Sequence, residues 1–141
     1  MPSYDPNNIF AQILRGELPC HKVYEDDKAL AFLDIMPRMP GHTLVLPKTP
    51  ARNILDVPAS DLAHVMMVAQ KVAKAAMTAF AADGITIQQF NEGAGGQVVF
   101  HLHVHIIPRK AGVPMKPPAS EKEKPEALAE HAKKLAAAIA G

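Results

Sequence analysis

The chain contains no tryptophan, few tyrosines and phenylalanines, and a single cysteine, and each scarcity excludes a class of protein. Cys20 has no possible disulfide partner within the chain, which favours a reducing compartment. The net charge of +1 and the small number of aromatic side chains provide no basic, stacking surface for nucleic acid. No apolar run has the length of a membrane span, and the polar segment 1–8 is unlike a signal peptide. We therefore expect a cytoplasmic protein that binds neither nucleic acid nor membrane.

The rest of the composition is that of a globular protein, with 48% hydrophobic and 21% charged residues in 141 positions. A chain of this length can form one domain with a substantial core. Its hydrophobic periodicity predicts an α+β fold without internal repeats. The expected elements, in chain order, are a helix at 9–14 capped by Asn7 or Asn8 and ended by Gly16, strands at 22–25 and 29–34 joined as a hairpin, a strand at 42–46, a long helix from about Ser60 to Gly84, and strands at 85–91 and 100–109.

The long helix carries an apolar stripe with two methionines, and we expect the whole stripe to belong to the core. Its members are Leu62, Val65, Met66, Ala69, Val72, Ala73, Ala76, Met77 and Phe80. The segment 110–125 is rich in proline, lysine and glutamate, which is typical of a mobile connector. A terminal helix at 125–139 has only a thin apolar edge, so we expect it to dock weakly or to pack on a second subunit. The chain is accordingly divided into a main domain at 1–110 and a linker with a C-terminal helix at 111–141.

The most informative segment is 100–109, in which His101, His103 and His105 alternate with apolar residues. Alternation with a period of two is typical of a β-strand. On a strand the three imidazoles form a row on one face, about 6.6 Å apart, and the intervening residues face the core. These core residues are Leu102, Val104 and Ile106. Histidine has no strong strand propensity and neighbouring imidazolium charges repel, so the row indicates chemistry rather than packing.

Three interpretations of the row compete. The first is an exposed strand face that is simply polar. The second is a metal site, but His101 and His105 would lie about 13 Å apart along a strand, so a three-histidine site needs a ligand from another element. The third is an array acting on a phosphate, in which a neutral imidazole attacks and an imidazolium donates. We favour the third interpretation and expect neither a metal nor a cofactor.

Other residues are ambiguous when taken alone. The loop 91–97 contains three glycines, and it is either a flexible hairpin loop or, beside the histidines, a cradle for phosphate. Asp34 can be a solvated carboxylate at a strand end, and His42 can be a turn residue. The remaining histidines, at positions 21, 64 and 131, have no such context, and His64 is expected at the surface.

Further motifs occur in a fixed order along the chain. They are Ile9-Phe10, Gly16-Glu17-Leu18-Pro19, Tyr24-Glu25-Asp26-Asp27, Ala31-Phe32-Leu33-Asp34-Ile35, Gly41-His42-Thr43-Leu44-Val45-Leu46-Pro47-Lys48, Asn91-Glu92-Gly93, Gly96-Gln97 and His101-Leu102-His103-Val104-His105. Together they resemble the histidine-triad (HIT) superfamily, and most closely its bacterial, Hint-like branch. The resemblance runs from about Ile9 to Arg109.

This resemblance implies a nucleotide-binding homodimer, with a five-stranded antiparallel sheet in each subunit that continues across the dimer. Members of the family hydrolyse or transfer nucleoside monophosphates from phosphoramidate, phosphate-ester or sulfate-anhydride leaving groups. By the match, His103 attacks the α-phosphorus and carries a nucleotidyl-histidine intermediate. His105 contacts the phosphate and the leaving group, and His101 and His42 complete the array. The backbone carbonyl of His101 is expected to accept a hydrogen bond from the His103 ring.

The same match assigns the binding residues for a purine nucleotide such as AMP. Asp34 is expected to bind the ribose hydroxyls, and Asn91 to contact the phosphate or the leaving group. Gly96 and Gln97 belong to the glycine-rich loop at the phosphate. The wall around the base is expected to consist of Ile9, Phe10, Phe32, Ile35 and Leu44.

Two departures from the family pattern matter. The positions of a zinc site found in bacterial relatives hold Asn8, Ala11 and Pro50, so we expect no structural zinc. Val98 stands where the family has a serine or threonine that donates to the phosphate. The loss of this donor leaves a second class of function open, a nucleotide-binding regulator or scaffold with little turnover. A metal-dependent hydrolase is the third class.

Overall fold

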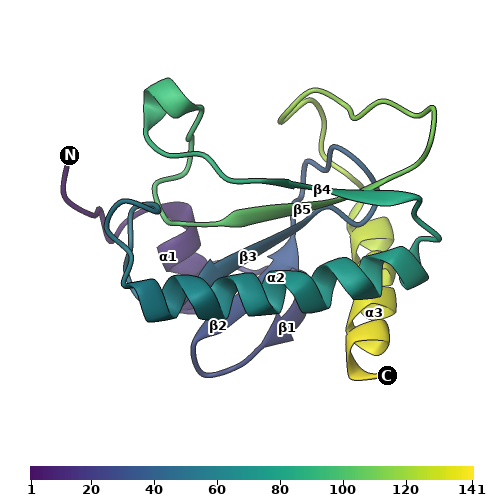
Figure 1. Cartoon of the computed structure of the whole chain (residues 1–141), viewed down its shortest axis with the longest axis horizontal. Helices are drawn as coiled ribbons and strands as arrows, with labels where there is room; N and C mark the ends of the chain where they lie inside the picture. The colour runs from purple at the N-terminus through teal and green to yellow at the C-terminus, as the bar shows by residue number, and fades with distance from the viewer.

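Five strands form one antiparallel sheet in the order β1-β2-β3-β5-β4 (Figure 1). The structure, a computed structural model, describes all residues from 1 to 141. The elements are α1 (Ile9–Leu14), β1 (Lys22–Glu25), β2 (Ala29–Leu33), β3 (Thr43–Pro47), α2 (Ala59–Ala79), β4 (Gly84–Gln88), the short 3₁₀ helix η1 (Gly93–Gly95), β5 (Val104–Arg109) and α3 (Pro125–Ala140). The α+β fold expected from the sequence is thereby confirmed.

The N-terminal elements form for local reasons that the sequence contains. The side chain of Asn8 caps α1, because its oxygen accepts a hydrogen bond of 2.9 Å from the backbone N–H of Ala11. Gly16 follows the helix with a φ of +78°, which glycine adopts without strain. The predicted hairpin of β1 and β2 is also confirmed, and a carboxylate oxygen of Asp26 accepts from the backbone N–H groups of Lys28 and Ala29 in its turn.

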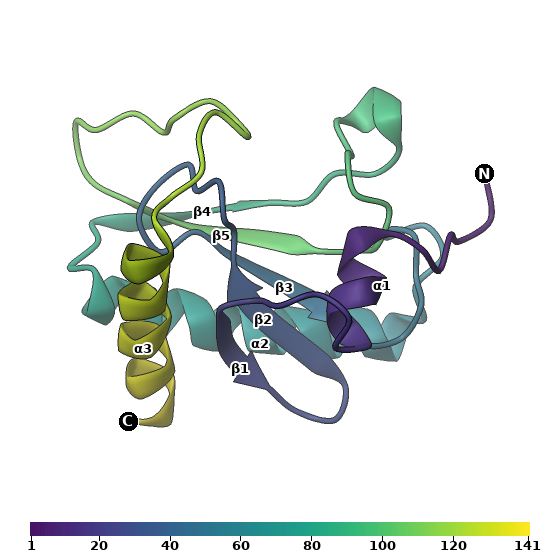
Figure 2. The same cartoon turned by 180° about the vertical axis from the view of Figure 1, so that it is seen from behind.

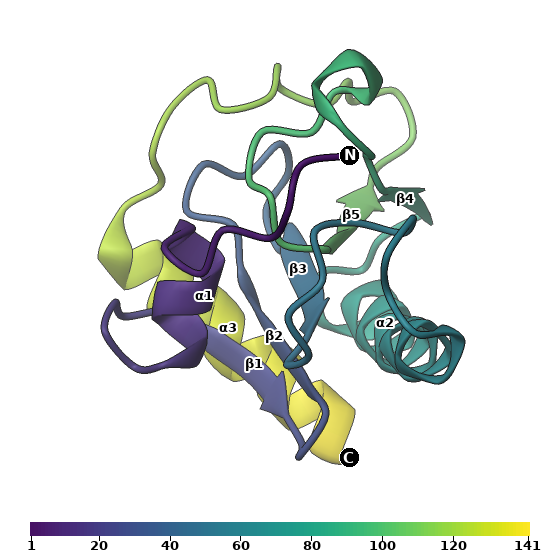
Figure 3. The ribbon, with the colours of Figure 1, turned by 90° about the vertical axis from the view of Figure 1, so that its left-hand side faces the viewer.

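The two faces of the sheet have different cores. Residues on one face of β2, such as Ala31 and Leu33, pack with α2 and α3 in the larger cluster. Leu30 and Phe32 alternate with them and point to the opposite face, where they pack with Phe10 of α1. Figure 3 shows this arrangement, with α1 and α2 on opposite sides of the sheet. Each face of the sheet thus has its own helices, α1 on one side and α2 with α3 on the other.

The apolar stripe on α2 is only partly core. Val65, Ala69 and Val72 are fully buried as predicted. Met66 and Met77 are 42% and 40% exposed, so their assignment to the core is wrong. The buried face consists of valines and alanines, whose small side chains let the helix lie close to the sheet, and the methionines lie outside this face.

The expectation that the C-terminal helix docks weakly or on a second subunit is also wrong. Leu128, Ala132 and Leu135 of α3 are buried in the larger core cluster, with Leu135 at 0% exposure. The helix contacts α2, β1 and β2 of its own chain. Figure 2 shows α3 next to these elements at one end of the molecule. The small alanine side chains of α3 allow this close packing, so a thin apolar edge is sufficient.

The segment before α3 is held by hydrogen bonds, which the expectation of a mobile connector did not include. The backbone N–H of Lys116 donates to the carbonyl of Arg38, and that of Glu123 donates to the carbonyl of Ile35.

None of the helices is both long enough and apolar enough to span a bilayer.

Candidate active site

Three histidine side chains meet beside β3 and β5, on the face of the sheet that carries α1. His42 immediately precedes β3, and the pairing of Leu44 with His105 brings the two strands into register. As a result, Nε2 of His42 lies 2.9 Å from Nδ1 of His105. His103 precedes β5, and its ring centroid lies 5.0 Å from that of His105. The sequence separation of His42 and His105 is 63 residues, so only the strand pairing brings them together.

His101 does not share a row with the other two histidines of its motif, and the prediction of one continuous strand from 100 is wrong. The strand β5 begins only at Val104. The backbone N–H of Leu102 donates to the carbonyl of Ala51, which draws the preceding chain towards the segment after β3. His101 is 0% exposed, and its ring bonds to the carbonyl of Pro47 at 2.8 Å and to the hydroxyl of Tyr4 at 2.7 Å.

The backbone of His101 nevertheless takes part in the site. Nδ1 of His103 lies 2.6 Å from the carbonyl oxygen of His101, as expected from the family resemblance. A carbonyl only accepts hydrogen bonds, so the His103 ring carries its proton on Nδ1. Its Nε2 then has a free lone pair, which is the form that a nucleophilic imidazole requires.

The same reasoning fixes the tautomers of the other rings. The backbone N–H of Arg38 donates to Nδ1 of His42 at 3.0 Å, so the proton of the neutral His42 ring is on Nε2. That N–H donates to Nδ1 of His105, which leaves the His105 proton on its own Nε2. The site thus combines one imidazole lone pair, on His103, with one imidazole N–H donor, on His105.

All four histidines favour the neutral form. Burial, together with the smaller effects of the charges of Arg38 and His103, lowers the pKa of His42 to about 4. Burial also lowers the pKa of His101 to about 4 and that of His105 to about 3. The pKa of His103 is lowered by burial as well, against the effect of its hydrogen bond to the His101 carbonyl. At neutral pH the array therefore carries no positive charge before a ligand binds.

Asp34 lies at the edge of this array. One of its carboxylate oxygens is 3.7 Å from Nε2 of His42, and the other accepts from the backbone N–H of Met36. Burial raises the pKa of Asp34. The contact with His42 is not an ion pair at neutral pH, because the His42 ring is neutral there.

Asp34, His42 and His105 are close enough together to be considered as metal ligands, since one ligand atom from each lies within 4.8 Å of the others. The tautomers do not fit a metal. Nε2 of His42 carries a proton, and it can lose this proton to a metal only if Nδ1 is protonated instead. A protonated Nδ1 would point at the N–H of Arg38, so two donors would face each other.

Three of the residues predicted to line the base belong to one packed apolar cluster. Phe10, Phe32 and Leu44 are buried together, and Phe10 also packs edge-on against the His103 ring with centroids 4.8 Å apart. Ile9 and Ile35 are 50% and 45% exposed. These two side chains therefore have free surface, whereas the three buried ones pack in a cluster that contacts His103 through Phe10.

The glycine-rich loop is held together internally by backbone hydrogen bonds. The backbone N–H groups of Gly95 and Gln97 donate to the carbonyl of Glu92, and that of Gly96 donates to the carbonyl of Gly93. Three amides of the proposed cradle are thus engaged within the loop. Gly96 has a φ of +97°, which favours glycine.

Gln97 and Asn91 are engaged in the same network. The Gln97 amide donates to the carbonyls of Arg52 and Val99 and accepts from the side chain of Asn53 and the backbone of Glu92. These four bonds use both donors and both lone pairs of the side-chain amide, so the Gln97 side chain holds the loop in place. The Asn91 side chain bonds to Gln89 and to the backbone of Ile54. The side chain of Val98 is 83% exposed.

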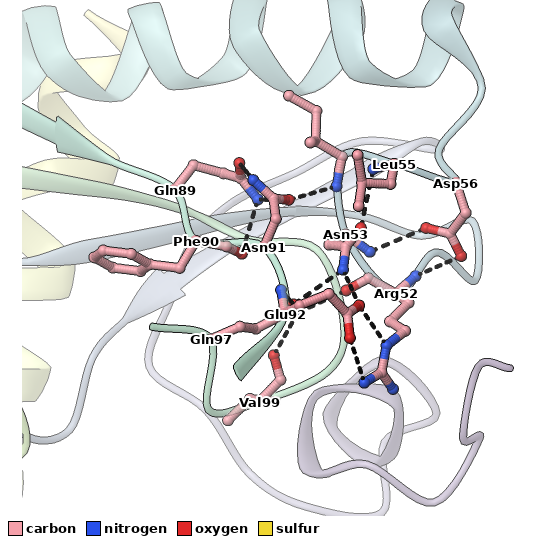
Figure 4. A network of polar contacts seen from close by, with 11 residues as sticks. Arg52, Asn53, Leu55, Asp56, Gln89, Phe90, Asn91, Glu92, Gln97 and Val99 are labelled. Carbon is pink, nitrogen blue, oxygen red and sulfur yellow. Dashed lines mark hydrogen bonds and ion pairs between the residues drawn. The ribbon is translucent and has the colours of Figure 1, made fainter. Parts of the chain in front are cut away.

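Several residues near the histidines were not found from the sequence. Tyr4 and Arg38 bond to them directly, and the Phe90 ring lies 5.5 Å from that of His105. Arg52 forms a two-point ion pair with Glu92 (Figure 4). Its guanidinium also lies over the ring of Phe100, 4.1 Å from the ring centroid. No local pattern marks these residues, because each partner is distant in the chain or is a backbone group.

The histidines outside the motif also differ from expectation in one case. His64 is 20% exposed and bonds to Asp26 at 2.7 Å, so it is a paired residue and not a plain surface one. His131 packs edge-on against Phe80, away from the array.

Comparison with known proteins identifies similar chains. The HIT domain family matches residues 15–112. A curated relative from Arabidopsis thaliana, Adenylylsulfatase HINT3, is 40% identical over 102 residues, which cover 72% of this chain and 52% of that protein. The chain therefore spans about half the length of this relative.

Two solved structures are similar along nearly their whole length. The crystal structure of a Hit-like protein involved in cell-cycle regulation from Bartonella henselae has a TM-score of 0.94 and 52% identity, covering 97% of this chain and 99% of that one. A hypothetical histidine triad nucleotide-binding protein from Sulfolobus tokodaii has a TM-score of 0.85 and 34% identity, covering 94% of this chain and 91% of that one.

Proposed function

This chain belongs to the HIT domain family, and on that premise we propose that it is a purine nucleotide-binding hydrolase or nucleotidyl transferase. The similarity to an adenylylsulfatase and to a histidine triad nucleotide-binding protein supports this class of ligand and reaction. The observation that carries the proposal is the bond from Nδ1 of His103 to the carbonyl of His101, since it leaves Nε2 of His103 free to attack.

The proposed reaction has two steps. Nε2 of His103 attacks the α-phosphorus of a nucleoside phosphoramidate, a P–N bond to His103 forms, and the bond to the leaving amine breaks. Water then attacks the nucleotidyl-histidine, its hydroxyl is transferred to phosphorus, and His103 is regenerated. The proton of that water balances the one taken up by the amine, so the overall reaction consumes one water and releases a nucleoside monophosphate and an amine.

The remaining residues support this chemistry by binding and orientation. The N–H at Nε2 of His105 donates a hydrogen bond to the phosphate or the leaving group, and it needs no proton from solvent to do so. Asp34 binds the ribose hydroxyls. The base lies against the exposed side chains of Ile9 and Ile35, above the buried Phe10.

The test is release of AMP from adenosine 5′-phosphoramidate in the presence of EDTA. His103→Ala should reduce turnover by several orders of magnitude, because the covalent nucleophile is lost. His64→Ala is the matched control and should retain activity, since His64 bonds only to Asp26 on another part of the fold. Mass spectrometry of quenched wild-type protein should detect an AMP adduct on His103. Activity abolished by EDTA, or near-native turnover of His103→Ala, would contradict the proposal.

A regulator with little turnover is the second candidate, and one observation favours it. The side chain of Val98 offers no hydrogen bond at the position where the family has a hydroxyl, and the amides of Gly95, Gly96 and Gln97 are engaged within the loop. AMP binding measured by calorimetry, together with no detectable AMP release, would favour this candidate over the enzyme.

We also propose that the protein is a homodimer joined along β4. This strand is at one edge of the sheet, so half of its backbone groups are free to pair. Ile87 on β4 is 48% exposed, and Met66 and Met77 on α2 are similarly exposed. A second copy would cover these apolar side chains. Light scattering should give about twice the chain mass of 15.2 kDa, and Ile87→Lys should shift the protein towards the monomer; a monomeric wild type would contradict this.

A further inference from the structure

The C-terminal segment 110–124 lies against the loop 34–42, which connects β2 to β3 and carries Asp34 and His42. Figure 2 shows this segment descending beside the loop before α3 begins. Two backbone hydrogen bonds join them, from Lys116 to the carbonyl of Arg38 and from Glu123 to the carbonyl of Ile35, each of 2.9 Å. A third bond runs in the opposite direction, because Nε of Arg38 donates to the carbonyl of Lys116 at 2.8 Å.

Arg38 is the residue at which these contacts converge. In addition to the paired bonds with Lys116, its Nη1 donates to the side chain of Gln88 at the end of β4, at 3.1 Å. Its backbone N–H donates to Nδ1 of His42. A single residue thus contacts the C-terminal segment, the edge strand and the histidine array.

We propose that Arg38 is a positioning residue through which the C-terminal segment 110–124 fixes the orientation of His42 and His105. This inference rests on the proposed function and deepens it, since it identifies what holds the phosphate side of that site. The guanidinium is planar and its donors have a fixed geometry, so it can bond to Lys116 and Gln88 at the same time.

The backbone N–H of Arg38 keeps the proton of His42 on Nε2, and that proton keeps Nδ1 of His105 as an acceptor. His105 must then present its own N–H at Nε2 to the substrate. If the loop is released, the bond to Nδ1 of His42 is no longer held, both His42 tautomers become populated, and His105 loses its fixed donor.

The charge of Arg38 has a separate effect that the experiment must distinguish. Asp34, His103, His105 and Arg38 are the titratable groups that face His42, and the positive charge of Arg38 lowers the pKa of both His42 and His105. A lysine retains this charge but has only one donor atom, which cannot reproduce the two-point contact of the guanidinium.

The test compares two variants. Arg38→Met loses both the positive charge and the two-point contact of the guanidinium, whereas Arg38→Lys loses only the two-point contact. Lys122→Met is the control, because Lys122 is a cation of the same segment with no hydrogen bond to the loop. We expect both Arg38 variants to lose about ten-fold or more in kcat/KM for adenosine 5′-phosphoramidate, and Lys122→Met to match the wild type. The acid limb of the pH–rate profile should move to higher pH in Arg38→Met alone.

The second readout is independent of turnover. Nitrogen NMR of the imidazoles should show one His42 tautomer in the wild type and a mixture of tautomers in both Arg38 variants. The control Lys122→Met should have the tautomer and the melting temperature of the wild type. If the wild type has no turnover, the proposed function fails, whereas a changed His42 tautomer still supports the role of Arg38. Wild-type kinetics and a wild-type tautomer in Arg38→Lys would overturn it.

A variant on the other side of the contact covers the case in which the Arg38 variants do not fold. Lys116→Pro removes the N–H that donates to the carbonyl of Arg38 and leaves the Arg38 side chain in place. We expect the same mixture of His42 tautomers in this variant, and a wild-type tautomer there would overturn the proposal.

Discussion

The hydroxyl of Tyr4 lies 2.7 Å from Nδ1 of His101, across 97 positions of the chain. Nε2 of the same ring bonds to the carbonyl of Pro47, so the ring proton is on Nε2 and Tyr4 donates. The two rings also pack edge-on, with centroids 5.6 Å apart. The N-terminal segment therefore secures the residue whose carbonyl orients the His103 ring.

The first prediction concerns this bond. Tyr4→Phe keeps the ring contact and removes only the hydroxyl, which leaves Nδ1 of the buried His101 without a partner. An unsatisfied buried group costs about 1–3 kcal/mol, so the free energy of unfolding in urea should fall by an amount in this range. An unchanged free energy of unfolding would mean that water replaces the hydroxyl.

The second prediction is a loss of stability in mild acid. The pKa values of His42 and His101 are lowered to about 4 and that of His105 to about 3, so between pH 6.5 and about 4 the unfolded chain binds more protons than the folded one. The contribution of the buried histidines to the free energy of unfolding is therefore at its maximum above pH 6.5, and it decreases as the pH falls through this window.

Urea unfolding at pH 7, 6, 5 and 4.5 measures this loss. The carboxylates act differently there. The pKa of Asp26 is lowered to about 2, so its stabilising effect is lost only below its unfolded value of 3.8, and the raised pKa of Asp34 opposes the loss. A free energy of unfolding that is constant from pH 7 to 4.5 would contradict neutral, buried histidines.

The third prediction is the position of the acid limb in the pH–rate profile. An unperturbed histidine would place this limb near pH 6.5. Because burial lowers the pKa of the whole array, we expect the limb below pH 5, measured as kcat/KM after subtraction of the uncatalysed rate. It belongs to the coupled rings together. A limb at 6.5 would mean that one ring is well solvated.

The fourth prediction concerns the ion pair of Arg52 and Glu92, which holds the glycine-rich loop beside Phe100. Glu92→Gln should lower both the melting temperature and kcat, because Arg52 is only 11% exposed and loses its two-point partner. The matched control is Glu17→Gln, which breaks the more exposed pair with Arg15. Equal effects of the two variants on melting temperature and kcat would show that the loop is held by other contacts.

The fifth prediction is a gain of activity. Val98→Ser restores the hydroxyl that the family pattern has at this position, and a hydrogen bond to a charged group contributes about 1.5–3 kcal/mol. We expect kcat to rise by about ten-fold or more. The valine is 83% exposed, so its loss should leave the melting temperature unchanged. A folded variant that is no faster would mean that the hydroxyl does not reach the phosphate.

Local features of the sequence were sufficient for most of the fold. The Asn8 cap, the Asp26 turn and the alternation in β5 depend on interactions within a few residues, so the sequence shows them directly. The identity of the histidine motif was equally visible. The buried half of α2 was predicted, but its methionines were not placed correctly, because periodicity alone does not say how wide the covered face is.

The sequence by itself determined which side chains are available for the chemistry, and the tertiary structure decided how each one is held. The tautomers depend on Tyr4, the Pro47 carbonyl and the Arg38 amide, which meet the rings through the packing of loops that are separate in the chain. The docking of α3 and of the segment before it likewise depends on surfaces that exist only after the sheet has formed. A residue pattern records spacing along one element, whereas a hydrogen-bond direction is fixed by a partner from another.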